Sequence, residues 1–306
     1  MQKVFFSSDG TNIEYTESGM GERLLLLYDC QGSDEERETL LMMLEKSYNV
    51  FCPERRSWLY NGIRRGKYSM ELECSELLEF MEEKEIGYLF GHGYGAVIAM
   101  HLALRYPLKK MVLFEAYLTC FRNLEWIPKF SRLIEKEDYF GASAVFLKSL
   151  GGIKRVIPFS LMKIFLKVLF EITIFPEDEA EQEAVKIICY EDPQEDAMWK
   201  KTVYERKRRN YARTVKQIGI SVEAALASEP ELAELTGIKT KTLIICDCGS
   251  EPYVFQSADE LAERIPDSRK IVVKLSGGRG EGGEPGKYPD FLKSITVFFN
   301  GGESSV

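Results

Sequence analysis

The stretch from residue 89 to residue 96 reads Leu89-Phe90-Gly91-His92-Gly93-Tyr94-Gly95-Ala96. A short apolar run ends at its first glycine, and an alanine-rich segment without glycine or proline continues to Arg105, just before Pro107. This order predicts a strand, a tight turn built on glycines, and a helix that ends ahead of the proline. Glycines in such a turn allow a strained backbone and a close approach of strand and helix. A strand followed directly by a helix is the repeating unit of an α/β sheet.

Short apolar runs alternate with helical patterns on both sides of this unit. Ser8-Asp9-Gly10 lies between two such runs and indicates a hairpin. The unbroken run from Leu24 to Tyr28 is typical of a strand that is covered on both faces. Further strands are expected at residues 49–52, 110–115, 242–246 and 270–275, and helices at residues 33–45, 69–85, 96–105, 258–264 and 288–299. The sequence therefore predicts the α/β class, with a mostly parallel sheet flanked by helices.

The strand pattern disappears after Ala116 for more than a hundred residues. Helical segments rich in aromatic residues and leucine replace it, so we expect an insertion and not a continuation of the sheet. We place the core at residues 1–117 and 239–306 and a helical cap, or lid, at residues 118–238. The cap contains the run Arg206-Lys207-Arg208-Arg209, which fits either a solvated helix face or a specific site for an anion or partner.

One stretch, Val156 to Phe175, approaches the apolar character of a membrane segment. Pro158, Lys163, Lys167 and Glu171 interrupt it, and the last three recur every four residues. This spacing puts a single charged stripe on an otherwise apolar helix. We expect a helix that is buried on most sides inside the protein, and the alternative is a helix lying in a membrane interface.

The composition limits partners and location. A net charge of -8 opposes binding to nucleic acid and anionic membranes, so we expect no nucleic-acid partner and no membrane association. The seven cysteines are odd in number and fall mostly in apolar or helical segments, which favours a reducing cytoplasm. The first residues reach Ser8-Asp9-Gly10 before an apolar signal region could form, so we expect no export. The sequence gives no indication of oligomeric state.

The stretch from Gly91 to Gly95 resembles the nucleophile elbow of the α/β-hydrolase family, whose pattern is G-x-S-x-G. The likeness extends over nearly the whole chain, because the hairpin, the strand and loop at residues 24–32, the elbow, the helical insertion and the final strands and helices follow the family's order. The resemblance implies an α/β-hydrolase fold with a lid. It does not by itself imply the family's function.

The resemblance also shows which catalytic groups this sequence lacks. The family's serine position is Gly93, which has no side chain to attack an acyl group. The family's histidine lies in a loop after the last strand, and here the glycine-rich stretch 276–283 has Arg279 nearest that position. A guanidinium stays protonated and cannot accept a proton. The chain's two histidines, His92 and His101, lie in the elbow and in the helix after it.

The family's acid follows the penultimate strand, where this chain offers Glu251 or, alternatively, Asp247. Glu251 and Arg279 would form an ion pair if they occupy the acid and base positions, whereas Arg279 would otherwise point into solvent. The family's His-Gly pair in the oxyanion loop is replaced by Tyr28-Asp29.

Backbone N–H groups of Cys30 and Tyr94 are still able to face a ligand in this arrangement. A negative charge on Asp29, however, opposes an oxyanion beside it. The same charge disfavours Cys30 as a nucleophile, because it raises the pKa of a neighbouring thiol.

These features predict a pseudoenzyme: an α/β-hydrolase-fold protein without hydrolytic activity that serves as a small-molecule-binding or interaction scaffold. The expected ligand is small and apolar or amphipathic and binds under the lid.

We expect no cofactor, and no metal, because Cys246-x-Cys248 is a single pair without histidines. The enzymatic alternatives are a hydrolase or esterase, or a cofactor-free lyase, with His92, Glu251 or Asp29 transferring protons. The degenerate triad positions are Gly93, Glu251 and Arg279, and the predicted pocket residues are Asp29, Cys30, His92, Gly93, Tyr94 and Glu251.

Overall fold

The structure is a computed structural model, and it describes residues 2–29, 34–54, 69–118, 124–149, 153–173, 193–228, 232–274 and 289–301. The chain divides into two compact units. The first comprises Met1–Arg122 with Ile220–Val306, and the second comprises Asn123–Gly219. The insertion expected at residues 118–238 contains the whole of the second unit.

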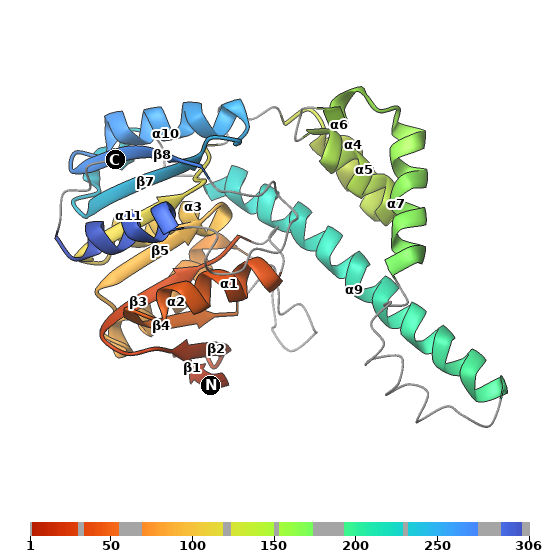
Figure 1. Cartoon of the computed structure of the whole chain (residues 1–306), viewed down its shortest axis with the longest axis horizontal. Helices are drawn as coiled ribbons and strands as arrows, with labels where there is room; N and C mark the ends of the chain where they lie inside the picture. The colour runs from red at the N-terminus through yellow and green to blue at the C-terminus, as the bar shows by residue number, and fades with distance from the viewer. Residues whose placement is uncertain are drawn as a thin grey trace. The chain divides into compact units, whose positions relative to one another are not determined.

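The first unit is built on an eight-stranded sheet with the order β1-β2-β4-β3-β5-β6-β7-β8 (Figure 1). The pairs β1–β2 and β2–β4 are antiparallel, and all other neighbouring pairs are parallel. The predicted class, a mostly parallel sheet flanked by helices, is confirmed. The strands are β1 (Gln2–Phe6), β2 (Asn12–Ser18), β3 (Glu22–Leu27), β4 (Tyr48–Pro53), β5 (Tyr88–His92), β6 (Lys110–Phe114), β7 (Lys241–Asp247) and β8 (Ser268–Val273).

Two apolar layers cover the sheet. One contains residues of α2 (Met70–Glu83), α3 (Tyr94–Ala103) and α10 (Pro252–Arg264), and the other contains residues of α1 (Asp34–Leu44) and α11 (Pro289–Phe299). The run of leucines in β3 serves both layers, because Leu25 and Leu27 point into the first and Leu24 and Leu26 into the second. A short 3-10 helix, η2 (Glu234–Gly237), precedes β7.

Helix α3 packs unusually close to the sheet. A Cβ added at Gly95 would lie 2.6 Å from the carbonyl carbon of Leu27, and one added at Gly91 would lie 2.7 Å from the Cα of Ala96. Gly93, between them, has φ 55° and ψ -118°, a conformation that side-chain-bearing residues rarely adopt. The glycines therefore serve the close approach and the strained turn for which the sequence predicted them.

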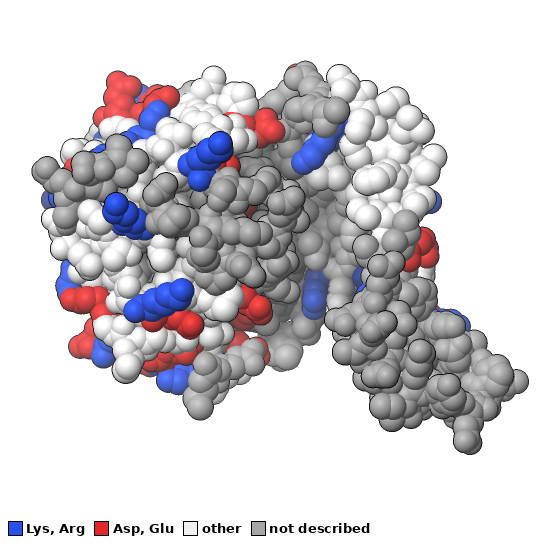
Figure 2. Space-filling view, in the orientation of Figure 1, with Lys and Arg blue, Asp and Glu red and all other residues white. Residues whose placement is uncertain are grey.

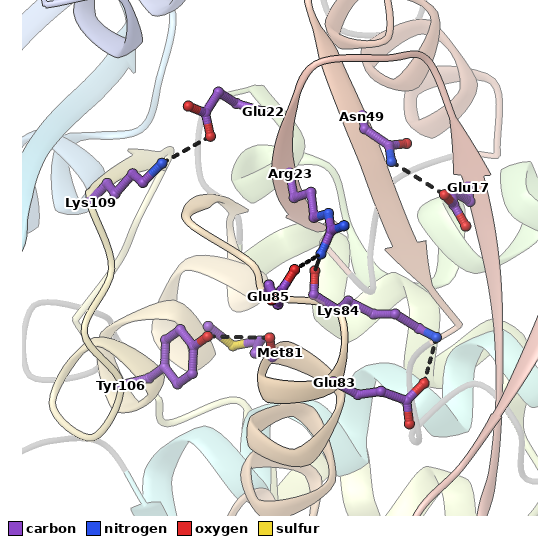
Figure 3. A network of polar contacts seen from close by, with 10 residues as sticks. All are labelled: Glu17, Glu22, Arg23, Asn49, Met81, Glu83, Lys84, Glu85, Tyr106 and Lys109. Carbon is purple, nitrogen blue, oxygen red and sulfur yellow. Dashed lines mark hydrogen bonds and ion pairs between the residues drawn. The ribbon is translucent and has the colours of Figure 1, made fainter.

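The amino-terminal ends of the central strands are tied together by polar contacts (Figure 3). Arg23 Nη1 at the start of β3 donates to the carbonyl oxygen of Lys84 at 2.9 Å and to Oε2 of Glu85 at 2.5 Å. Lys109, just before β6, pairs with Glu22 at 3.0 Å. Such exposed pairs contribute about 0–1 kcal/mol each. They fix the turns at the end of the sheet opposite the elbow.

The second unit is helical and contains α4 (Ile127–Glu135), α5 (Tyr139–Ser149), α6 (Ile153–Val156), α7 (Phe159–Thr173) and much of α9 (Pro193–Ser228). An aromatic cluster holds it together, with Phe140 stacked on Tyr211 at 4.9 Å and Phe170 against both. The Tyr211 hydroxyl donates to Ser143 Oγ at 2.6 Å, and burial raises the pKa of Tyr211.

The expectation that the segment from Val156 to Phe175 is buried on most sides is wrong for its described part. Helix α7 packs on one side only, where Met162 is buried and Lys163 pairs with Asp138 at 2.5 Å. Its opposite side is apolar but exposed. Helix α7 is apolar around most of its circumference, and α5 covers one side of it. No helix in the described part of the chain is long and apolar enough to span a membrane.

We expect Gly95→Ala to destabilise the protein by about 2–4 kcal/mol, because the added methyl group forces α3 away from β3. Urea unfolding followed by circular dichroism measures the effect. Gly237→Ala is the matched control, since its new Cβ meets only the flexible end of Leu104 at 3.3 Å. Equal losses for the two variants would contradict the close packing at Gly95.

Candidate functional site

Three chain segments meet at the carboxyl ends of the central strands. β5 lies between β3 and β6, so the residues that follow these strands, Asp29, Gly93 and Glu115, share one edge of the sheet. The strand order reverses between β3 and β5, and open α/β sheets bind ligands at such a switch point. We therefore take this edge as the candidate site.

The carboxylate of Asp29 lies in the space directly above Gly93. A Cβ added at Gly93 would be 2.5 Å from both Cγ and Oδ2 of Asp29 and 2.9 Å from its Cβ. The Gly93 N–H donates to the carbonyl oxygen of Phe114 at 2.9 Å, which fixes the turn against β6. Any side chain at position 93 would have to displace Asp29.

Asp29 also binds the start of helix α3. Its Oδ1 accepts the backbone N–H of Tyr94 at 3.3 Å. The first N–H groups of a helix have no partner within the helix, and a negative charge there is stabilised by the helix dipole. The residue at the N-cap position is Gly93, which has no side chain to cap with. Asp29 supplies this cap from the end of another strand.

His92 packs as an aromatic ring. It lies 4.8 Å from Phe114 in a stacked arrangement and 5.0 Å from Tyr28. Alternation along β5 puts His92 on the same face as Phe90, the face covered by α1 and α11. The structure thus places His92 among rings below the elbow, whereas Asp29 lies above Gly93.

Glu115 is a site residue that the sequence analysis missed. It is only 8% exposed and adopts a positive φ of 51°. Its Oε1 accepts the backbone N–H of Asp247 at 2.8 Å and the hydroxyl of Ser250 at 2.5 Å. Glu115 therefore anchors the turn between β7 and α10. The signal for it in the sequence is a carboxylate at the carboxyl end of the apolar strand expected at residues 110–115.

Glu251 lies at the far end of this anchored turn. It is the N-cap of α10, which begins at Pro252, earlier than the expected residue 258, because proline is favoured in the first helical turn. Its side chain is half-buried and makes no capping hydrogen bond, while its carbonyl oxygen accepts the Val254 N–H at 2.9 Å.

Solved structures share this arrangement of strands and helices. An α/β hydrolase from Sphaerobacter thermophilus DSM 20745 matches with a TM-score of 0.67 and 18% identity, over 97% of this chain and 100% of that one. The chain has the α/β-hydrolase fold. An enol-lactonase from Burkholderia xenovorans LB400 matches with a TM-score of 0.58 and 17% identity, over 97% and 100% of the two chains. A meta-cleavage product hydrolase from Pseudomonas fluorescens IP01 matches with a TM-score of 0.56 and 17% identity, over 98% and 97%.

No protein-family model and no curated protein matches the sequence. At identities below one fifth, the structural likeness defines the α/β-hydrolase fold and leaves the reaction open.

Two predicted site residues, Cys30 and Arg279, lie outside the described residues. The ion pair of Glu251 with Arg279 and the contribution of Cys30 to a pocket therefore stay predictions. Among the residues that the sequence grouped together, the structure brings Asp29, Gly93 and Tyr94 into direct contact.

The cysteine pair at the end of β7 does not share one environment. Cys246 is fully buried, and burial, with the nearby Glu115 carboxylate, raises the pKa of its thiol to about 12. Cys248 is exposed. Within the part of the chain that the structure describes, no three histidine, cysteine or acidic residues are grouped closely enough to hold a metal ion.

We expect Glu115→Ala to destabilise this α/β-hydrolase fold by about 2–3 kcal/mol, because it leaves the Asp247 N–H and the Ser250 hydroxyl without their acceptor. Ser250→Ala alone removes one partner, with an expected loss of about 1 kcal/mol. Urea unfolding of both variants and of the double variant gives the coupling energy. Additive losses would show that Glu115 does not anchor the turn through Ser250.

Proposed function

We propose that this protein is a pseudoenzyme of the α/β-hydrolase fold that binds a small molecule or a partner and does not hydrolyse esters or amides. The observation that carries the proposal is the position of the Asp29 carboxylate, which fills the space above Gly93 and accepts the Tyr94 N–H. In the family that the sequence resembles, the side chain of the nucleophilic serine occupies the space above the elbow. The N–H of the next residue, here Tyr94, donates to the oxyanion in that family.

The absence of a nucleophile at the elbow supports the proposal. Acyl transfer needs an oxygen or sulfur atom that loses its proton to a nearby base as it attacks. Gly93 offers no such atom, and the nearest side-chain group above it is a carboxylate. A water molecule or substrate carbonyl would have to compete with Asp29 for the same space.

The electrostatics of the turn also support it. A tetrahedral intermediate carries a negative charge, which the N–H after the nucleophile normally stabilises. Here that N–H already faces the carboxylate of Asp29. Two unit charges about 4 Å apart at an effective dielectric constant of about 20 repel by about 4 kcal/mol. Such a penalty would slow the reaction by roughly a thousandfold.

The candidates for a catalytic base are weak. His92 is packed between Tyr28 and Phe114, and Arg279, which the resemblance puts at the base position, stays protonated. Of the three groups proposed for proton transfer, His92, Glu251 and Asp29, it is Asp29 whose carboxylate lies over Gly93. A cofactor-free lyase or esterase that uses Asp29 is therefore the second candidate function.

The ligand we propose is small and apolar or amphipathic. At the elbow, the carboxylate of Asp29 favours a hydrogen-bond donor or a cationic group over a carboxylate or phosphate. A pseudoenzyme of this kind would keep the α/β-hydrolase fold for binding, while its elbow would supply no nucleophile.

A fluorophosphonate probe and a panel of short-chain and long-chain acyl esters test the loss of hydrolysis. We expect no covalent labelling and no turnover by the wild-type protein, because Gly93 has no side chain and, among the described residues, the group that lies above it is the Asp29 carboxylate. An active serine esterase run in parallel checks the reagents. Covalent labelling of any side chain at the elbow would overturn the proposal, and turnover that Asp29→Asn abolishes would establish the second candidate instead.

The overlap of Asp29 with a side chain at position 93 can be tested by a double-mutant cycle. We expect Gly93→Ala to destabilise by about 2–4 kcal/mol and to cost clearly less in an Asp29→Gly background, where the space is empty. Urea unfolding of the four proteins measures the coupling. Independent effects of the two substitutions would mean that Asp29 does not fill this space.

The same overlap predicts which variants with a restored catalytic triad have esterase activity. We expect G93S/R279H to stay inactive towards the ester panel, because Asp29 still opposes the oxyanion. Adding D29G removes this obstacle, so esterase activity or fluorophosphonate labelling is expected first in the triple variant. Equal activity of the double and the triple variant would contradict the role given to Asp29.

A further inference from the structure

Helix α7 presents a continuous apolar face to solvent. Its large side chains follow the spacing i, i+3, i+4, i+7 and i+8, which places them on one side of the helix. They are Leu161, Ile164, Phe165, Val168 and Leu169, with exposed fractions of 57%, 56%, 59%, 50% and 43%. Val156, just before the helix, is 77% exposed. The view in Figure 2 shows few charged side chains where α4, α5 and α7 lie.

This exposed face is not needed to hold the helix in place. The opposite side of α7 already packs on its neighbours through Met162, which is 4% exposed, and through Phe170, which contacts Phe140 at 5.4 Å. Lys163 on that side pairs with Asp138. Contiguous apolar surface that the fold does not use marks a site of interaction.

The exposed charged side chains of this segment are basic on balance. Residues 153–173 contain four Lys or Arg and one Glu. Lys154, Lys167 and Glu171 are exposed, whereas Lys163 pairs with Asp138. The second unit as a whole has 17 Lys and Arg and 15 Asp and Glu, a net charge of +2. Since the whole chain has a net charge of -8, the first unit has a net charge of -10. The expectation against membrane association was drawn from the total charge, which conceals this difference between the units.

We propose that α7 lies in the interface of an anionic lipid bilayer, with its five exposed apolar side chains between the acyl chains and with Lys154 and Lys167 at the headgroups. Apolar residues on one side of a helix and lysines on its flank are the features of interfacial helices. A second copy of the chain fits less well, because a symmetric contact brings Lys167 of both copies to one interface. The proposal is independent of the proposed function at the elbow.

Flotation with lipid vesicles tests this inference on the whole protein. We expect it to bind vesicles that mix phosphatidylglycerol with phosphatidylcholine, to bind phosphatidylcholine alone much more weakly, and to lose binding as salt is raised. Phe165→Ser should lower the partition coefficient by about tenfold, and Lys167→Gln by about fivefold. Both positions are exposed, so unchanged circular dichroism is expected.

Matched controls are available in the first unit. Phe6→Ser removes a phenylalanine that is 69% exposed on β1, and Lys239→Gln removes an exposed lysine, so neither should change vesicle binding. The inference is overturned if the wild-type protein does not float with anionic vesicles, or if Phe6→Ser weakens binding as much as Phe165→Ser. A dimer in sedimentation that Phe165→Ser dissociates, without vesicle binding, would assign the face to a second copy of the chain.

Discussion

The close backbone contact between helix α3 and the sheet is the constraint on which the site depends. Gly95 lies against the carbonyl of Leu27 and Gly91 against Ala96, at separations that leave no space for a methyl group. This contact fixes the turn between β5 and α3 and holds Gly93 in its strained conformation. It also sets the distance between the end of β3 and the start of α3, and therefore the place that Asp29 reaches.

Once that distance is set, a carboxylate at position 29 meets the N-terminus of a helix whose N-cap residue, Gly93, has no side chain. The attraction between the carboxylate and the Tyr94 N–H stabilises the turn. The same attraction makes the turn a poor place for a second negative charge. A carboxylate at position 29 therefore stabilises the turn between β5 and α3, and the same carboxylate would disfavour an oxyanion next to the Tyr94 N–H.

In the second, helical unit, side-chain packing decides which surfaces are exposed. Its aromatic cluster and the pair of Lys163 with Asp138 fix one side of α7, and the other side remains apolar and exposed. Acidic residues predominate in the first unit and basic residues slightly in the second. Surface properties averaged over the whole chain therefore describe neither unit well.

The sequence by itself determined the features that rest on local patterns. The leucines of β3, the glycines of the elbow and the alternation of strands and helices follow from backbone sterics and the periodicity of neighbouring residues, so the α/β class and the strained turn could be predicted. Glu115 needed the structure, because its hydrogen bonds reach Asp247 and Ser250 across 132 and 135 residues. The same holds for Asp29, whose contact with Tyr94 joins residues 65 positions apart. For α7, periodicity identified which side chains share a face, but only packing against neighbouring helices decided which face stays in solvent.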